Sequence, residues 1–429
     1  MARIVLTCWG SHGDVDPYLA LARGLAARGH APILAAPAYF REVSDAAGVA
    51  FHPIRPSVDP TDAALVRRIM DPAKGSEVVL RELIMPAAAA MYDDLSPLAD
   101  AADLLVGHPV TVATRVLAER RGLPWASVVL APTSFFSATD APVLPPAPWL
   151  KDAERWVPAI GGWIVRGARL ATSGWDAPLQ ALRAREGLPP APSPIFEGQH
   201  SPHLVLALFS RLLAEPQPDW PAHVVVAGQC LYDAPHGTAL SPALEAFLAA
   251  GEPPIVFTLG SAAVMAAGDF YARSLAAARA VGRRAVLLVG RDGMAAWAGE
   301  RGDDVHVAAA APHSLLFPRA AAVAQQCGAG TLGQGLRAGR PILGVPFAHD
   351  QLDDAYRARG LGMARVLPVG RYPAARAAAE LRALLDDPSY AEAAARVGAV
   401  ARAEDGVGAA CAAIERLLAP ARPRAAASA

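Results

Sequence analysis

Two glycine-containing segments combine backbone turns with side chains that could do chemistry. The first, residues 324–331, reads Ala-Gln-Gln-Cys-Gly-Ala-Gly-Thr. It predicts a strand that ends in a glycine-rich turn and opens a helix, which points several backbone N–H groups and the positive end of the helix dipole into one small volume. A diphosphate group fits such a volume. The alternative is a tight turn that only packs the strand against the helix.

A polar pair, Asp350 and Gln351, follows the next predicted strand. Their side chains can accept hydrogen bonds from, and donate them to, the hydroxyl groups of a sugar. Ligands of open parallel sheets bind at the carboxyl ends of the strands. A phosphate cradle and a hydroxyl clamp would therefore lie on neighbouring strands, which predicts a nucleotide-sugar site in the C-terminal half.

The second segment, residues 9–17, lies between the first predicted strand and the first predicted helix. Asp14 and His12 are its candidates for the general base that must accept the proton of an attacking hydroxyl. The ordinary histidine pKa of about 6.5 suits proton transfer by His12, whereas Asp14 would need burial to raise its basicity. Asp14 could instead cap the helix, but Asp16 fits the cap better because it precedes Pro17. We rank Asp14 first.

Candidates for an acceptor pocket follow two other predicted strands. His108 lies in a Gly-His-Pro segment after one strand, and Phe135 and Phe136 follow another. The apolar rings favour a hydrophobic acceptor, and packing in a core is an equally weighted alternative for them. The Asp-Asp pairs of the chain lack a convergent partner, so no metal site is predicted.

Two series of alternating strands and helices would position these segments. Strands are predicted in the first half at residues 3–8, 31–35, 104–106, 126–130 and 204–208, and in the second at 255–259, 285–289, 305–308, 321–325 and 342–345. Helices are predicted at residues 17–28, 61–70, 76–92 with a kink at Pro86, 110–121, 270–281 and within 373–418. This alternation predicts an α/β protein with two Rossmann-like, doubly wound parallel sheets that face each other across a cleft.

The length of 429 residues exceeds what one hydrophobic core usually holds. Prolines within residues 216–221 indicate a linker. We expect an N-terminal acceptor-binding domain at residues 1–215 and a C-terminal nucleotide-sugar-binding domain at residues 222–400. A helix at 401–419 should pack back on the first domain, and residues 420–429 should form a frayed tail.

Composition narrows the function classes. The chain has 39 Lys and Arg against 40 Asp and Glu, so its net charge of -1 offers no field that attracts nucleic acid or an anionic membrane. No apolar run approaches the roughly 20 residues of a membrane span, and the N-terminus lacks the features of a secretory signal. Four scattered cysteines fit reduced thiols. We expect a soluble, cytoplasmic protein.

The second half resembles the inverting nucleotide-sugar-dependent glycosyltransferases of the two-Rossmann-domain (GT-B) fold, which include plant and bacterial small-molecule, sterol and antibiotic glycosyltransferases. Their donor motif reads His-His/Gln-Gly-Gly-x-Gly-Thr, followed by Ala-Gly-x-Pro and a terminal Asp-Gln. Gly328, Gly330 and Thr331 match the first motif, residues 338–341 match the turn, and residues 350–351 match the end. The resemblance implies that Thr331 and its neighbouring amides hold the diphosphate and that Asp350 and Gln351 bind the sugar.

The resemblance also implies roles for other residues. Ser261 ends a Phe-Thr-Leu-Gly-Ser match and would face the donor phosphates. Asp14 matches the Gly-Asp-Val variants of the sterol and glycopeptide enzymes, which implies that a carboxylate is the base. The family needs no metal, and the nucleotide sugar is a co-substrate rather than a cofactor.

Two positions depart from the family motif. Gln325 stands where the family has its first His, and Cys327 where it has the first Gly of the pair. Gln325 and its neighbour Gln326 remain candidates for donor binding, because an amide can donate an N–H. A charge-assisted hydrogen bond is roughly twice as strong as a neutral one, so we expect weaker stabilisation of the leaving diphosphate.

The expected reaction moves a sugar from a UDP- or dTDP-linked donor to a hydroxyl of a small, largely apolar acceptor, with inversion at the anomeric carbon. Two alternatives stay open. The departures at Gln325 and Cys327 fit a relative that binds a nucleotide or an apolar ligand, or assists a partner enzyme, without catalysis. A sugar-nucleotide epimerase could use the same double-Rossmann architecture.

Overall fold

The computed structural model of the chain describes residues 1–59, 62–145, 147–154, 156–157, 159–233, 239–300 and 302–419. The predicted tail at residues 420–429 lies outside the described residues, and so does Thr61, with which one helix was predicted to begin.

The first half of the chain forms a sheet of parallel strands in the order β3-β2-β1-β4-β5-β6-β7. Residues of its central strands are fully buried, as expected for a sheet that is covered on both faces. The strands are β1 (Arg3–Thr7), β2 (Ala31–Ala36), β3 (Ala50–Pro53), β4 (Leu104–Gly107), β5 (Trp125–Val129), β6 (Leu204–Ala207) and β7 (Val224–Val226).

The second half forms a parallel sheet in the order β10-β9-β8-β11-β12-β13. Its strands are β8 (Ile255–Thr258), β9 (Ala285–Leu288), β10 (Val305–Ala308), β11 (Ala322–Gln325), β12 (Ile342–Gly344) and β13 (Ala364–Val366). In both sheets the chain first adds strands on one side of the first strand, β1 or β8, and then adds the remaining strands on its other side. The strand order therefore reverses between β1 and β4 and between β8 and β11, which confirms the two predicted doubly wound sheets.

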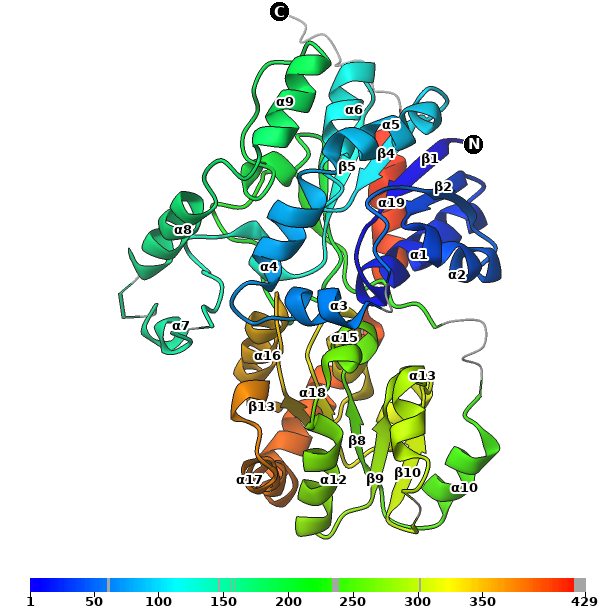
Figure 1. Ribbon diagram of the computed structural model, residues 1–429, viewed down its shortest axis with the longest axis vertical. Coiled ribbons are helices and arrows are strands. Elements are labelled where there is room, and N and C mark those ends of the chain that lie inside the picture. Colours follow the sequence, from blue (N-terminus) through cyan, green and yellow to red (C-terminus); the bar gives the residue numbers. More distant parts are fainter. Residues whose placement is uncertain are drawn as a thin grey trace, which may run out of the picture.

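Helices connect the strands and cover the sheets (Figure 1). Those of the first half are α1 (His12–Ala27), α2 (Arg41–Ala46), α3 (Ala63–Ile69), α4 (Gly75–Glu77), α5 (Ala88–Ala99), α6 (Ala113–Arg121), α7 (Trp149–Glu154), α8 (Ala159–Ala171) and α9 (Ala177–Arg185). Those of the second half are α10 (Pro242–Ala249), α11 (Gly260–Ala263), α12 (Phe270–Ala280), α13 (Gly290–Gly293), α14 (His313–Leu316), α15 (Ala329–Ala338), α16 (Gln351–Gly360), α17 (Ala374–Asp386), α18 (Pro388–Ala403) and α19 (Gly406–Leu418).

The C-terminal helix α19 crosses back to the first sheet, where Figure 1 shows it in red and where it packs against α1 and β6. Cys411 and Ile414 of α19 belong to the same buried cluster as Leu21 and Leu25 of α1. A Cβ on Gly24 would lie 2.5 Å from a methyl carbon of Val407, so the two helices approach as closely as a glycine allows. The end of the chain thus contributes to the core of the first domain.

Helix α1 begins earlier than predicted. The sequence favoured Pro17 as the start and Asp16 as the cap, but the helix starts at His12 with Ser11 as its N-cap. The Ser11 side chain accepts from the Gly13 backbone N–H, and the Asp14 carboxylate accepts from the Ser11 N–H at 2.7 Å. This capping box satisfies the first N–H groups of the helix, which is why Pro17 lies inside α1.

The predicted domain boundary is also corrected. β7 pairs in parallel with β6, so the first sheet continues beyond the predicted linker at residues 216–221 and the second domain does not begin at 222. The predicted helix at 76–92 is broken into α4, a π-helix (Val78–Ile84) and α5, because Pro86 lies between the last two. Helices α7 to α10 and the short strands β3, β7 and β13 had no sequence prediction.

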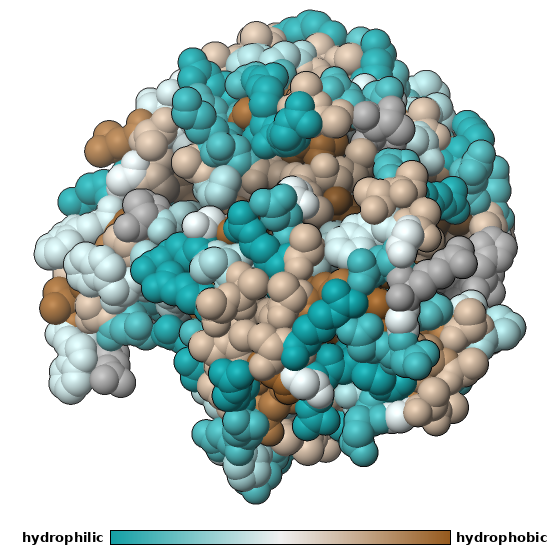
Figure 2. All heavy atoms as spheres, turned by 60° about the horizontal axis from the view of Figure 1, so that its bottom comes forward, coloured by the Kyte–Doolittle hydropathy of each residue, from teal (hydrophilic) through white to brown (hydrophobic). Residues whose placement is uncertain are grey.

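The surface carries no broad apolar area on the face seen in Figure 2, where hydrophilic and hydrophobic side chains are interspersed. Within the described ranges, no helix has both the length and the apolarity that a bilayer crossing requires.

We predict that Ile414→Ala lowers the melting temperature markedly. Ile414 is fully buried, and truncation of a buried isoleucine costs about 2–5 kcal/mol. Val400→Ala on α18 is the matched control because that side chain is 50% exposed. Thermal denaturation followed by circular dichroism measures both. Equal melting temperatures of the two variants would contradict the packing of α19 on the first domain.

Candidate functional site

The site lies where the two sheets reverse their strand order. α1 follows β1 and α15 follows β11, and their N-terminal ends meet at the junction of the two halves (Figure 1). A Cβ on Gly330 would lie 3.5 Å from the Gly13 Cα, so only the space of about one methyl group separates the two helix ends. The positive ends of two helix dipoles therefore point toward the same region, which favours an anion there.

The donor candidates of the glycine-rich turn come together at this point. Gln326 donates through Nε2 to Thr331 Oγ1 at 3.1 Å, and both side chains are at least nine-tenths buried. Gly260, with a φ of +63°, lies against them: a Cβ there would be 2.4 Å from Gln326 Nε2. A Cβ on Gly328 would lie 3.3 Å from the same atom. Ser261 follows Gly260 in α11 and is exposed.

Gln325 does not join this group. Its side chain is fully buried, and a Cβ on Gly335 would lie 2.4 Å from its Nε2, which places the amide beneath α15. Both of its polar side-chain atoms lack a hydrogen-bond partner within the described residues. Cys327 is buried with a φ of +65°, a left-handed conformation that favours glycine. Of the two glutamines, only Gln326 contacts the predicted diphosphate cradle.

The predicted sugar clamp lies at the start of α16. Gln351 Oε1 accepts from the backbone N–H groups of Phe347, at 2.9 Å, and Ala348, at 3.3 Å, so this side chain closes the turn that presents Asp350. Burial and the negative charge of Asp14 raise the pKa of Asp350 to about 7. The two carboxylates thus act on each other across the junction of the domains.

A neighbouring residue ties this turn to the first domain. His349 has a φ of +59°, which is uncommon outside glycine. Its Nδ1 lies 3.2 Å from Ser76 Oγ on α4. A Cβ on Gly75 would lie 3.3 Å from the imidazole of His349. The strained backbone at His349, directly before Asp350, therefore lies where this turn contacts α4 of the first domain.

The base candidate Asp14 has a partner that the sequence did not indicate. His108, predicted for the acceptor pocket, follows β4, and its Nε2 lies 3.5 Å from Asp14 Oδ1. Asp14 Oδ2 accepts from the backbone N–H of Ser11 at 2.7 Å and from its hydroxyl at 3.2 Å. Burial pushes the pKa of Asp14 upward, but the hydrogen bonds from His108 and Ser11 outweigh burial and hold that pKa below its ordinary value. Burial therefore does not give Asp14 the raised basicity that the sequence led us to expect it would need.

His12 is arranged differently. Its Nδ1 lies 3.2 Å from Asp16 Oδ1, and 48% of its side chain is exposed. The hydrogen bond to Asp16 raises the pKa of His12, which favours the protonated imidazole and disfavours its use as a base. The structure thus favours Asp14, paired with His108, over His12.

Phe135 and Phe136 lie away from these residues. Phe135 stacks on Trp220, with ring centroids 3.9 Å apart, and Phe136 packs edge-to-face on Phe196. Both line a groove of about 1040 Å³ whose walls include residues just before β5, β6 and β7. In a parallel sheet these residues mark the amino ends of the strands, the edge opposite to Asp14. The structure therefore does not bring the two phenylalanines together with the base.

Comparisons with known proteins place the chain among glycosyltransferases. Residues 4–107 match the family described as "Glycosyltransferase family 28 N-terminal domain". The chain is 34% identical to O-mycaminosyltylonolide 6-deoxyallosyltransferase of Streptomyces fradiae, over 96% of this chain and 97% of that protein. It is 32% identical to the glycosyltransferase GtfE of Amycolatopsis orientalis, over 84% of this chain and 85% of that protein.

Solved structures share the fold along the whole chain. The glycotransferase of kitacinnamycin superposes with a TM-score of 0.73 at 23% identity, over 97% of this chain and 99% of that one. The glycosyltransferase VinC, in complex with DTDP, superposes with a TM-score of 0.67 at 19% identity, over 97% and 99% of the two chains. Fold and site define a glycosyltransferase of the two-Rossmann-domain class. The chain belongs to the family of natural-product glycosyltransferases that contains the Streptomyces fradiae and Amycolatopsis orientalis relatives.

We predict that substitutions at the two adjacent glutamines change different properties, nucleotide affinity at Gln326 and thermal stability at Gln325. Gln326→Leu removes the donor to Thr331 and should weaken the binding of a nucleoside diphosphate roughly two- to tenfold, as expected for one neutral hydrogen bond. Gln325→Leu removes a buried amide without partners and should raise the melting temperature while it leaves that affinity unchanged. Calorimetry and thermal denaturation measure both. Loss of affinity in Gln325→Leu alone would reverse the assignment.

The raised pKa of Asp350 predicts a pH-dependent stability. Between its ordinary value of 3.8 and about 7, the folded protein retains a proton that the unfolded chain releases, so this carboxyl lowers stability as the pH rises through that window. Asp350→Asn removes the effect. The melting temperature of the variant minus that of the wild type should be near zero at pH 4 and positive at pH 8. A difference that does not grow with pH would show that Asp350 titrates normally.

Proposed function

We propose that the protein transfers a sugar from a nucleoside-diphosphate sugar to a hydroxyl group of a small natural product, with inversion at the anomeric carbon. The observation that carries the proposal is the contact between the N-terminal ends of α1 and α15, which brings the Asp14–His108 pair next to the Gln326–Thr331 cradle. The solved complexes of VinC with DTDP and of spinosyn rhamnosyltransferase SpnG with thymidine diphosphate support a thymidine diphosphate donor, with uridine diphosphate as the rival.

In this proposal the diphosphate lies against the start of α15. The backbone N–H groups of the Gly328–Thr331 turn, the Thr331 hydroxyl and Ser261 donate to its oxygens. Gln326 adds a neutral N–H, whereas Gln325, at the position of the family's first His, is buried beneath α15 and does not reach the cradle. The dipoles of α1 and α15 supply the positive potential that stabilises the departing diphosphate, since preorganised dipoles cost no reorganisation as charge develops.

The transfer itself is a single displacement. The acceptor oxygen attacks the anomeric carbon on the face opposite to the diphosphate, the bond to the diphosphate breaks, and the configuration inverts. The acceptor proton passes to Asp14, whose lowered pKa keeps it ionised at neutral pH. His108 Nε2, beside Asp14 Oδ1, orients the carboxylate and favours its ionised form before the proton arrives. Asp350 and Gln351 hold the sugar hydroxyls.

The acceptor is proposed from the relatives. The name of the Streptomyces fradiae relative gives O-mycaminosyltylonolide, a glycosylated natural product, as what that enzyme modifies. We infer a largely apolar acceptor of comparable kind for this chain. Because Phe135 and Phe136 line a groove at the opposite edge of the sheet, the proposed acceptor position rests on its closeness to Asp14 and His108 instead.

We predict that Asp14→Asn reduces transfer by roughly 10²- to 10⁴-fold, the usual worth of a general base. The asparagine can still accept from the Ser11 N–H, so the capping of α1 and the affinity for thymidine diphosphate should persist. Asp16→Asn in the same helix is the matched control and should retain transfer. Product formation is measured by chromatography with a panel of nucleotide sugars and macrolide or glycopeptide aglycones.

Three outcomes of that assay would refute the proposal. Full activity of Asp14→Asn would exclude this carboxylate as the base. Conversion of the donor sugar in the absence of an acceptor would indicate an epimerase. Nucleotide binding by the wild type without transfer to any acceptor would indicate an auxiliary protein.

A further inference from the structure

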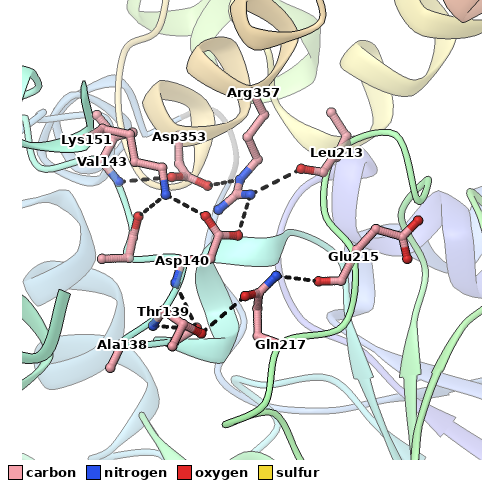
Figure 3. A network of polar contacts seen from close by, with 12 residues as sticks. Ala138, Thr139, Asp140, Val143, Lys151, Leu213, Glu215, Gln217, Asp353 and Arg357 are labelled. Atoms are coloured by element: carbon pink, nitrogen blue, oxygen red, sulfur yellow. Dashed lines mark hydrogen bonds and ion pairs between the residues drawn. The ribbon is translucent and has the colours of Figure 1, made fainter. Parts of the chain in front are cut away.

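Charged side chains that take no part in the proposed reaction join the two domains (Figure 3). Asp140 and Lys151 come from the segment that follows β5, and Asp353 and Arg357 come from α16. Arg357 donates through Nη1 to Asp140 Oδ2 at 2.7 Å and through Nε to Asp353 Oδ2 at 2.6 Å. Lys151 Nζ lies 2.5 Å from Asp140 Oδ1.

Backbone groups of the first domain complete this network. Asp353 Oδ1 accepts from the Val143 N–H at 2.9 Å, and Arg357 Nη1 donates to the Leu213 carbonyl at 3.1 Å. Val143 belongs to the segment after β5, whereas Leu213 follows β6. Two separate pieces of the first domain therefore bind one helix of the second.

The network is buried, which makes its geometry specific. Asp353 and Arg357 expose 2% and 8% of their side chains, and Asp140 and Lys151 about a fifth. Burial alone would favour neutral side chains. The charges of Arg357 and Lys151 outweigh burial and lower the pKa of Asp140. Buried ion pairs hold only when geometry and further hydrogen bonds compensate the lost hydration, so a small displacement of α16 would be costly.

The same helix carries the proposed sugar clamp. Gln351 is the first residue of α16 and Asp350 precedes it, while Asp353 and Arg357 lie within the next two turns. The turn before the clamp is held by the contact of His349 with Ser76 on α4. The first domain thus contacts the clamp segment on both sides. The diphosphate cradle is on another helix, α15, which these contacts do not include.

We propose that the network of Asp140, Lys151, Asp353 and Arg357 sets the position of the donor-sugar clamp, and that Arg357 is a positioning residue for the sugar and not for the nucleotide. This inference rests on the proposed function, since it requires Asp350 and Gln351 to bind the donor sugar. It also makes donor selection depend on residues of the first domain, which otherwise serves the acceptor.

An exposed ion pair provides a matched control. Arg359, on the same helix, pairs with Asp152 of α7 at 2.8 Å and also joins the two domains, but these side chains are 40% and 65% exposed. Exposed pairs contribute little, because solvent screens them and their side chains are mobile. Asp140→Asn and Asp152→Asn therefore remove one carboxylate charge each from cross-domain pairs on one helix, and differ chiefly in burial.

Asp140→Asn should lower kcat/KM for the nucleotide sugar roughly tenfold or more, since misplacing reacting groups by about 1 Å can cost on the order of 10²-fold. The affinity for the free nucleoside diphosphate, measured by calorimetry, should stay within about twofold. The ratio of kcat/KM for two donors with the same nucleotide and different sugars should also change. Asp152→Asn should leave all three quantities near wild type.

Three further variants guard against a folding defect. Lys151→Gln keeps the Arg357–Asp140 pair and should have a smaller effect of the same kind, and Arg357→Lys should be more active than Arg357→Met because it keeps the positive charge. Equal losses of sugar turnover and nucleoside diphosphate affinity would overturn the inference, and so would unchanged donor kinetics in folded Asp140→Asn. Failure of the proposed function would appear separately, as a wild-type protein that transfers no sugar.

Discussion

The contact between the N-terminal ends of α1 and α15 is the constraint on which the rest of the site depends. Each end carries the partial positive charge of a helix dipole, so their meeting is favourable only where negative charge is supplied. The Asp14 carboxylate supplies part of it from within the chain, through its hydrogen bond to the Ser11 N–H at the start of α1.

The two carboxylates that meet at the domain junction, Asp14 and Asp350, differ in ionisation because their surroundings differ. Asp14 is held by Ser11 and His108, so its charged form is favoured despite burial. Asp350 is also crowded and feels the charge of Asp14, which raises its pKa to about 7. Two nearby carboxyl groups whose environments separate their pKa values can take different roles. In the proposed reaction one receives a proton while the other binds sugar hydroxyls.

The domains are joined by charge as well as by helix ends. Arg357 satisfies carboxylates from both domains, and the resulting pairs are buried at the place where α16 leaves the sugar clamp. The close contacts at the cleft are therefore of two kinds. Helix dipoles face the region proposed for the diphosphate, and a buried ion-pair network lies beside the region proposed for the sugar. A domain movement that opened the cleft would have to break the second kind.

The sequence by itself determined the doubly wound sheets and the segments at their strand ends, because hydrophobic periodicity and glycine turns are local properties of the chain. It could not choose between Gln325 and Gln326, since that choice depends on which of two adjacent side chains passes beneath α15. The partnership of Asp14 with His108 and the displacement of Phe135 to the opposite edge of the sheet were likewise decided by tertiary structure. Each depends on how segments far apart in the chain pack, and local sequence patterns do not determine that packing.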